Sequence, residues 1–188
     1  MTASDSPRPQ DARPSRLRLP VIAWVFAVAC LAVGGAMVAL GVGYLRCSRV
    51  NAQVQAAVSE ISMIIGGARQ NYGKYGYSGL TTAVAIGSRV IPEARADGGG
   101  MTATNGYAGA ITLIDNSAKM AGTAILSYAD VPAAQCAQIV AAVRPLTREI
   151  GVQGIVVTRP DGTIAATGLD AQCASAAGVK IDFVFGRI

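Results

Sequence analysis

The chain has 188 residues, a formal net charge of +5 and no histidine. Because histidine is the commonest general base and a frequent metal ligand, its absence argues against the usual hydrolase and metalloenzyme classes. The carboxylates stand singly, mostly where turns and helix caps explain them, so the sequence predicts no catalytic site, no metal site and no cofactor.

Residues 1–18 read MTASDSPRPQDARPSRLR and are rich in proline, serine, aspartate and arginine. They show no apolar periodicity, which predicts a disordered leader. The arginines of this tail outnumber its two aspartates. By the positive-inside rule, the tail is expected to lie in the cytoplasm.

Residues 19–45 are predicted to form a transmembrane helix, because no charged side chain occurs between Arg18 and Arg46. A bilayer requires about 20 apolar residues, whereas a cleavable signal has an apolar core of only about 7 to 15. A lipoprotein signal ending at Cys30 is disfavoured, because the chain stays apolar beyond it. Residues 46–188 are then expected to form one extracytoplasmic domain.

Helical periodicity continues beyond the span in RVNAQVQAAVSEISMIIGGARQ, residues 49–70. Apolar residues recur there at spacings of one face of a helix, and Glu60 is expected on the opposite, polar face. The residues proposed to pack this helix or to mediate assembly are Val50, Val54, Val58, Ile61 and Ile65. Gly66, Gly67 and the tyrosine-rich run 71–79 are expected to end the helix. These tyrosines are predicted to pack on their own domain.

Two further segments precede the first strand. LTTAVAIGSRVIP, residues 80–92, is predicted to be a short helix that ends at Gly87. DGGGMTATNG, residues 97–106, lacks both a preceding strand and a lysine, so it is interpreted as a surface loop and not a phosphate-binding loop.

The C-terminal half mixes strand and helix patterns. Short β-rich runs end at Asp115 and Tyr128, and a helix with Asp130 as its N-cap is expected over residues 130–151. Two β runs around the turn RPDG follow, and VKIDFVF, residues 179–185, alternates strictly. The order of elements predicts an α+β fold in which the long N-terminal helix packs on an antiparallel sheet.

The two cysteines of the C-terminal half, Cys136 and Cys173, are expected to form a disulfide, because paired thiols in an oxidising compartment are normally bridged. Cys173 is placed in a loop before the last strand, and no role is assigned to Cys30 or Cys47. Arg144 and Arg148 are expected to share a helix face. No lysine- or arginine-rich run with interleaved aromatics occurs, so nucleic acid is not an expected partner.

The ordered set of these segments resembles the type IV pilins of class IVb and their PilS-like conjugation-pilus subunits. The resemblance rests on ISMIIGGARQNYG (61–73), LTTAVAIGSRVIP (80–92), NGYAGAITL (105–113) and YADVPAAQC (128–136). It implies a non-enzymatic structural subunit, major or minor, that a lipid-embedded helix holds in the inner membrane before the subunit joins other pilins. Adhesion or conjugative transfer would be the role of the fibre, and a prepilin peptidase would be a processing partner.

The junction SRLRLPVIAWVF departs from the family pattern, because it lacks both the small residue before the apolar segment and the glutamate within it. Two alternatives therefore remain open at this stage. The protein is either a pilus subunit, at the cell surface once assembled, or an extracytoplasmic binding domain that stays on its single-pass anchor and does not polymerise.

Overall fold

The computed structural model describes residues 49–187. The leader, the predicted span at 19–45, Cys30 and Cys47 lie outside the described residues. Within the described part, no helix combines the length and the apolar character needed to cross a membrane.

A long helix forms the first element and runs from residue 49, the first described residue, to residue 72. The expectation that Gly66 and Gly67 contribute to its end is wrong, because the helix passes through both glycines. A Cβ on Gly67 would lie 3.6 Å from Val90. This is an ordinary van der Waals distance, so a side chain would fit at Gly67. The helix continues because packing of its buried face outweighs the low helix propensity of glycine. A 3₁₀ turn, η1 (Gly73–Tyr75), follows the helix.

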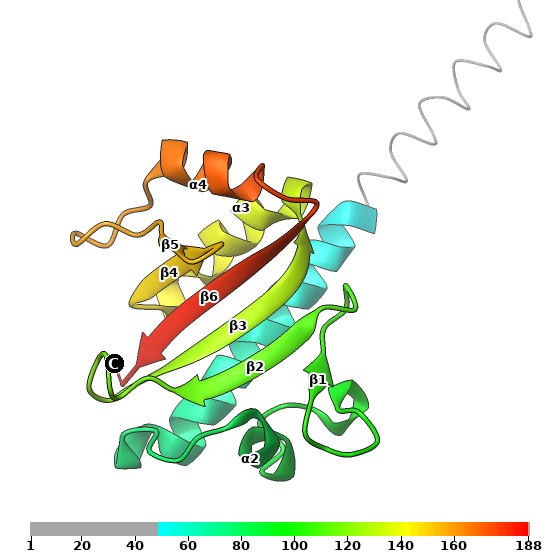
Figure 1. The fold of residues 1–188 in the computed structure, drawn as a ribbon, viewed down its shortest axis with the longest axis vertical. Helices are drawn as coiled ribbons and strands as arrows, with labels where there is room; N and C mark the ends of the chain where they lie inside the picture. The colour runs from blue at the N-terminus through cyan, green and yellow to red at the C-terminus, as the bar shows by residue number, and fades with distance from the viewer. Residues whose placement is uncertain (1–48, 188) are drawn as a thin grey trace, which may run out of the picture. The chain divides into compact units, whose positions relative to one another are not determined.

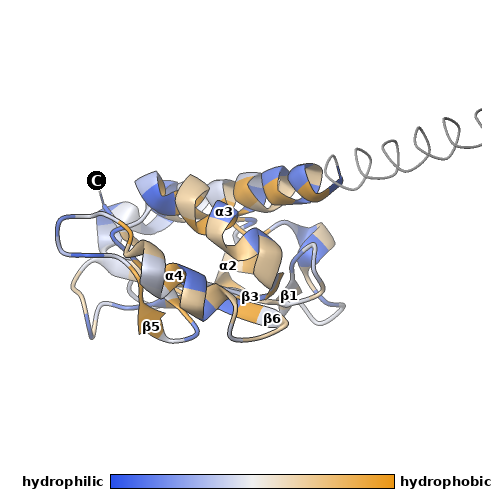
Figure 2. Cartoon of the chain, turned by 90° about the horizontal axis from the view of Figure 1, so that it is seen from above, coloured by the Kyte–Doolittle hydropathy of each residue, from blue (hydrophilic) through white to orange (hydrophobic). Residues whose placement is uncertain are grey.

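Six antiparallel strands form a single sheet in the order β1-β2-β3-β6-β4-β5 (Figure 1). The strands are β1 (Ala103–Thr104), β2 (Ala110–Asp115), β3 (Thr123–Pro132), β4 (Glu149–Val152), β5 (Ile155–Val156) and β6 (Gly178–Gly186). The helix lies across one face of this sheet, as Figure 2 shows. The predicted fold class, an α+β domain with a long helix packed on an antiparallel sheet, is confirmed.

The core lies between the long helix and the sheet. The alternating residues predicted on β6, namely Val179, Ile181, Phe183 and Phe185, are all fully buried. The helix contributes buried residues from Val54 to Ala68 to the same cluster. Within residues 49–187, the buried cluster runs from Val54 to Phe185 and joins the helix to the sheet.

Three short helices complete the domain: α2 (Thr82–Gly87), α3 (Ala133–Val143) and α4 (Ala166–Cys173). The Thr81 hydroxyl caps α2 by accepting a hydrogen bond from the Val84 N–H at 3.3 Å. The predicted N-cap of α3 is wrong, because the cap position is held by Pro132. Asp130 instead adopts a left-handed φ of 56° where the register of β3 against β6 shifts.

The structure differs from the sequence prediction in three further places. The helix ends at Val143, and β4 begins at Glu149, inside the stretch expected to be helical. Cys173 is the last residue of α4 and does not lie in a loop. This helix buries only Leu169 and Cys173, so it gives little periodic signal. The segment interpreted as a surface loop contains the two-residue strand β1.

Candidate functional site

The helix residues proposed from the sequence face the sheet to different degrees. Val54, Ile61 and Ile65 are at most 5% exposed. Val58 is half-buried against the core, and Val50, near the beginning of the described helix, is 36% exposed. The buried members of this set pack the helix onto its own domain, and a contact between two copies through them stays a prediction.

The charged residues between Arg49 and Lys74 are turned towards the domain. Only Glu60 and Arg69 carry charge in this interval. Arg69 is half-buried and donates through Nε to the Gly186 carbonyl at 3.0 Å and through Nη2 to the Leu146 carbonyl at 2.6 Å. Arg69 thereby ties the helix to the end of β6.

Glu60 is 8% exposed, so its predicted place on a polar outer face is wrong. Its carboxylate accepts a hydrogen bond from the Tyr128 hydroxyl at 2.5 Å and pairs with Arg95 Nε at 2.5 Å. Burial raises the pKa of Tyr128, and the hydrogen bond to Glu60 and the Glu60 charge raise it further. Helical periodicity did not indicate this arrangement, because it cannot show partners on distant elements, here strand β3 and the short 3₁₀ helix that ends at Arg95.

The outer face of the helix is left uncharged. Its exposed residues include a series spaced alternately by four and three positions: Ala52, Ala56, Ser59, Met63, Gly66 and Gln70. Solvated helix faces normally carry charged side chains. A face of small and neutral residues at this spacing matches the pattern of a helix that packs against another helix.

A cavity of about 100 Å³ lies beside the helix at the level of Ala56. Its lining consists of Gln53, Ala56, Ala57, Glu60, Arg95, Gly106, Tyr107 and Tyr128. The Tyr107 ring stands edge-on to Tyr128 with 6.4 Å between centroids, and the Tyr107 hydroxyl hydrogen-bonds to Gln135 on α3. The cavity therefore has a wall of aromatic rings and a second wall formed by the helix.

The Asn-Gly-aromatic motif at residue 105 positions Tyr107. The Asn105 side chain is buried, donates to the Ala129 carbonyl at 2.7 Å, and accepts from the N–H groups of Tyr107 at 2.8 Å and Gly109 at 3.0 Å. A Cβ on Gly109 would lie 2.1 Å from the Ala129 oxygen, so only glycine allows this approach. The motif fixes the loop before β2 against the irregular part of β3.

A disulfide joins Cys136 on α3 to Cys173 at the end of α4, with 5.7 Å between the Cα atoms. The bond connects two helices that are separated in sequence by β4 and β5. The disulfide therefore holds the two ends of the segment that contains β4 and β5 close to each other.

Comparison with known proteins gives the family. The PilS model, described as PilS N terminal, matches residues 51–185. The chain belongs to the PilS family. A search of curated protein sequences gives no match.

Two solved structures of type IV pilins share the fold of this PilS-family chain. The type IVb pilin from Salmonella typhi has 16% identity and a TM-score of 0.52, and the match covers 72% of this chain and 99% of that chain. TcpA, a type IV pilin from the Vibrio cholerae El Tor biotype, has 15% identity and a TM-score of 0.51, with 70% and 98% covered. The resemblance to type IVb pilins stated from the sequence is confirmed.

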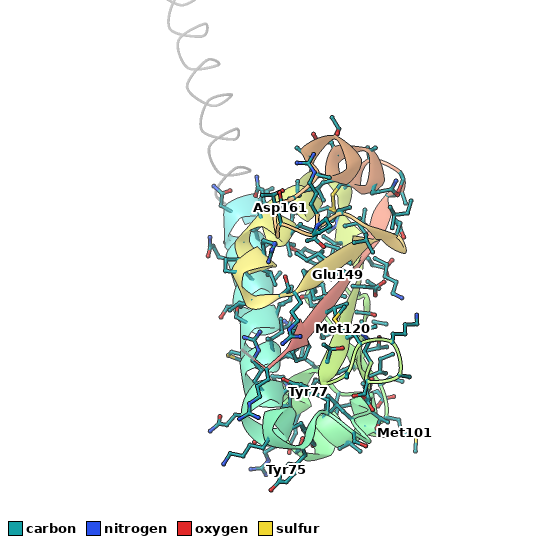
Figure 3. All side chains as sticks on the ribbon, turned by 90° about the vertical axis from the view of Figure 1, so that its left-hand side faces the viewer. Tyr75, Tyr77, Met101, Met120, Glu149 and Asp161 are labelled. Atoms are coloured by element: carbon teal, nitrogen blue, oxygen red, sulfur yellow. A yellow bond between two sulfur atoms is a disulfide. The ribbon has the colours of Figure 1, made fainter. Side chains whose placement is uncertain are left out.

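The tyrosine-rich segment of this PilS-family chain does not form a single aromatic surface. Tyr77 is fully buried and packs edge-on against Phe185, with 5.6 Å between ring centroids. Tyr72 donates to Ser88 at 3.0 Å. Tyr75 is 80% exposed beyond the end of the long helix, as Figure 3 shows.

The basic residues weighed for nucleic-acid binding are dispersed. Arg144 donates to the Gly162 carbonyl at 2.7 Å, and Arg148 donates to the Arg187 carbonyl at 2.7 Å. Arg148 lies beyond the end of α3, so the expected shared helix face is wrong. Both guanidinium groups bind backbone carbonyls of their own domain. In residues 49–187, no group of three or more acidic or cysteine side chains is arranged to hold a metal ion.

The face of the sheet opposite the long helix carries an open groove of about 530 Å³. Ile114, Ile125 and Val184 stand in register across three strands on its floor. Beside this apolar row, the Ser127 hydroxyl donates to Asp182 at 2.5 Å. Met120 and Glu149, both labelled in Figure 3, lie along the same groove.

Proposed function

We propose that this PilS-family protein is a structural subunit of a type IV pilus. Residues 19–45 hold it in the inner membrane as a single-pass protein before assembly, with residues 46–188 outside the cytoplasm. In the fibre, subunits pack through the outer face of the long helix. A catalytic role is not part of the proposal.

The uncharged outer face of the helix carries this proposal. Burying a charged side chain between subunits is costly unless the charge is paired. Here Glu60 is already paired with Arg95, and Arg69 already binds backbone carbonyls. The small residues Ala52, Ala56 and Gly66 permit close approach of another helix, as in bundles of apolar helices.

The groove on the opposite face of the sheet supports a role for the fibre in adhesion. If the helix lies inside the fibre, this face is directed outwards and stays accessible. Conjugative transfer is the second role considered for the fibre. The alternative is that the protein remains on its membrane anchor as an extracytoplasmic binding domain without polymerising.

A matched pair of charge substitutions tests the proposal. Ala56 on the long helix and Ala134 on α3 are both exposed helical alanines. We expect Ala56→Glu to abolish recovery of the protein in sheared fibres and Ala134→Glu to leave it unchanged, with both variants keeping the native unfolding temperature. A native protein that never leaves the inner membrane for the sheared fraction would favour the anchored alternative.

The mature N-terminus tests processing. A prepilin peptidase acting at the junction near Arg18 would leave a chain that starts at about residue 19 to 21. The segment removed would be a short N-terminal leader. An intact chain that retains residues 1–18 would contradict cleavage and would assign these residues to a permanent cytoplasmic tail.

A further inference from the structure

The lining of the cavity beside the long helix is mostly apolar, and its two charged side chains are paired with each other. The Glu60 oxygens are bound by Arg95 and Tyr128, and the Tyr107 hydroxyl is bound to Gln135. The remaining walls include the methyl groups of Ala56 and Ala57 and the two tyrosine rings. An apolar group fits this environment better than a charged or strongly hydrogen-bonding group.

Met63 is a large apolar side chain on the outer face of the same helix, and it is 59% exposed. The other exposed residues of the outer-face series are small or polar, so Met63 is the one large apolar side chain that projects from this series. An unbranched thioether with three rotatable bonds adapts readily to an irregular cavity. The cavity volume of about 100 Å³ is well above the roughly 10 to 15 Å³ that a single water molecule needs, so the tip of a methionine side chain can enter it.

We propose that Met63 of one copy inserts into the cavity beside Ala56 of the next copy. This inference rests on the proposed assembly through the outer helix face and adds the register of that assembly. Residues 56 and 63 are seven positions apart, and each helical residue rises about 1.5 Å, so neighbouring copies are displaced by about 10 Å along the helix axis.

The arrangement is heterologous. Met63 and the cavity occupy different places on the surface, so each copy gives its methionine to one neighbour and receives a methionine from another. A heterologous contact whose rotation does not close produces an open helical filament. The same contact thereby provides both attachment and axial spacing without a charged pair.

The neutral character of the two surfaces supports a second copy as the occupant. The only charges in the cavity, on Glu60 and Arg95, already compensate each other at 2.5 Å. The outer helix face contributes no charge near Met63. In sequence, Arg46 and Arg49 separate this face from the segment between Arg18 and Arg46, which also has no charged residue. Two uncharged surfaces lose no ionic hydration when they meet.

Cross-linking within assembled fibres tests the register. In the full chain with Cys30→Ala and Cys47→Ser, the pair Ala56→Cys and Met63→Cys is treated with a short bismaleimide, which leaves the native disulfide intact. We expect a ladder of covalent multimers, at least several-fold stronger than from the offset pairs Ala52→Cys with Met63→Cys and Ser59→Cys with Met63→Cys. Each single cysteine variant serves as a background control.

Fibres that form without a ladder from the Ala56 pair, or with the strongest ladder from an offset pair, would overturn the register and leave the proposed function intact. A native chain that forms no fibres would instead overturn the proposed function, and this inference with it.

Substitutions in the otherwise native chain provide a second measurement. Met63→Leu should retain fibre yield, whereas Met63→Ala should reduce it about tenfold. Gln138→Ala, at an exposed position on α3 outside this face, should have no effect. Since Met63 is exposed in the single copy, unfolding temperatures should not change. Equal fibre yields from the alanine and leucine variants would contradict the insertion of Met63.

Discussion

The ion pair between the buried Glu60 and the partly exposed Arg95 leads to an asymmetric prediction. The Glu60 side chain is 9% exposed, whereas the Arg95 side chain is 37% exposed. Removing Arg95 leaves a carboxylate inside the domain with the Tyr128 hydroxyl as its hydrogen-bond donor. Removing the Glu60 charge leaves a guanidinium that can turn to water. The variant Arg95→Met should therefore be less stable than Glu60→Gln.

The magnitudes follow from this difference in exposure. Breaking a fully buried pair costs about 3 to 5 kcal/mol. Because solvent screens Arg95, a smaller loss of about 2 kcal/mol is expected for Arg95→Met. Glu60→Gln should cost about 1 kcal/mol, since the amide oxygen can still accept from Tyr128. For a domain of about 140 residues, these losses correspond to roughly 6 to 10 °C and about 3 to 5 °C in the midpoint of thermal unfolding.

The double variant separates the pair from its surroundings. When Glu60 is replaced by glutamine, the loss of Arg95 no longer leaves an unpaired buried carboxylate. The double variant, Arg95→Met with Glu60→Gln, should therefore be nearly as stable as Glu60→Gln alone. The assay is thermal and urea unfolding of residues 48–188, which contain the whole described core. Arg89→Met is the control, because Arg89 pairs with Glu93 on the surface, where the side chains are 82% and 72% exposed. Strictly additive losses, or an Arg95→Met variant as stable as Glu60→Gln, would refute the reasoning.

Two other perturbations test the packing around this pair. Gly109→Ala should destabilise the domain by about 1 to 3 kcal/mol through overpacking against the Ala129 carbonyl, whereas Gly98→Ala, with open space around it, should change stability little in the same urea titration. Burial raises the pKa of Tyr128 above its ordinary value near 10. The unfolded chain therefore loses this proton first, so the contribution of Tyr128 to stability should be constant below about pH 10 and fall above it. Tyr128→Phe should weaken that fall while Tyr75→Phe, at a position 80% exposed, should not, and identical alkaline profiles would contradict this assignment.

Sequence periodicity was sufficient for elements with one buried face and one exposed face. The strict alternation of β6 predicted its buried side chains, since successive residues of a strand point to opposite faces. The spacing of Val54, Ile61 and Ile65 indicated an amphipathic helix, and the antiparallel α+β class followed from the order of the segments. The ordered motifs by themselves indicated the resemblance to type IVb pilins.

Periodicity was insufficient where the determining partner is distant in sequence. The helical spacing placed Glu60 on the polar face, and only the approach of Arg95 and Tyr128 accounts for its burial. Asp130 resembles a helix cap locally, but the longer pairing of β3 with β6 places it in a strand irregularity.

The sequence by itself determined that the protein has a long helix, an antiparallel sheet and an apolar segment free of charge. The tertiary structure alone decided which side of the helix is available to another molecule. The residues with the strongest apolar pattern are buried under the sheet, and the charges are paired inside the domain. A neutral face with Met63 and the neighbouring cavity remains exposed. Only the tertiary structure decides this, because a local sequence pattern shows which residues are apolar, whereas exposure depends on which surfaces the fold covers.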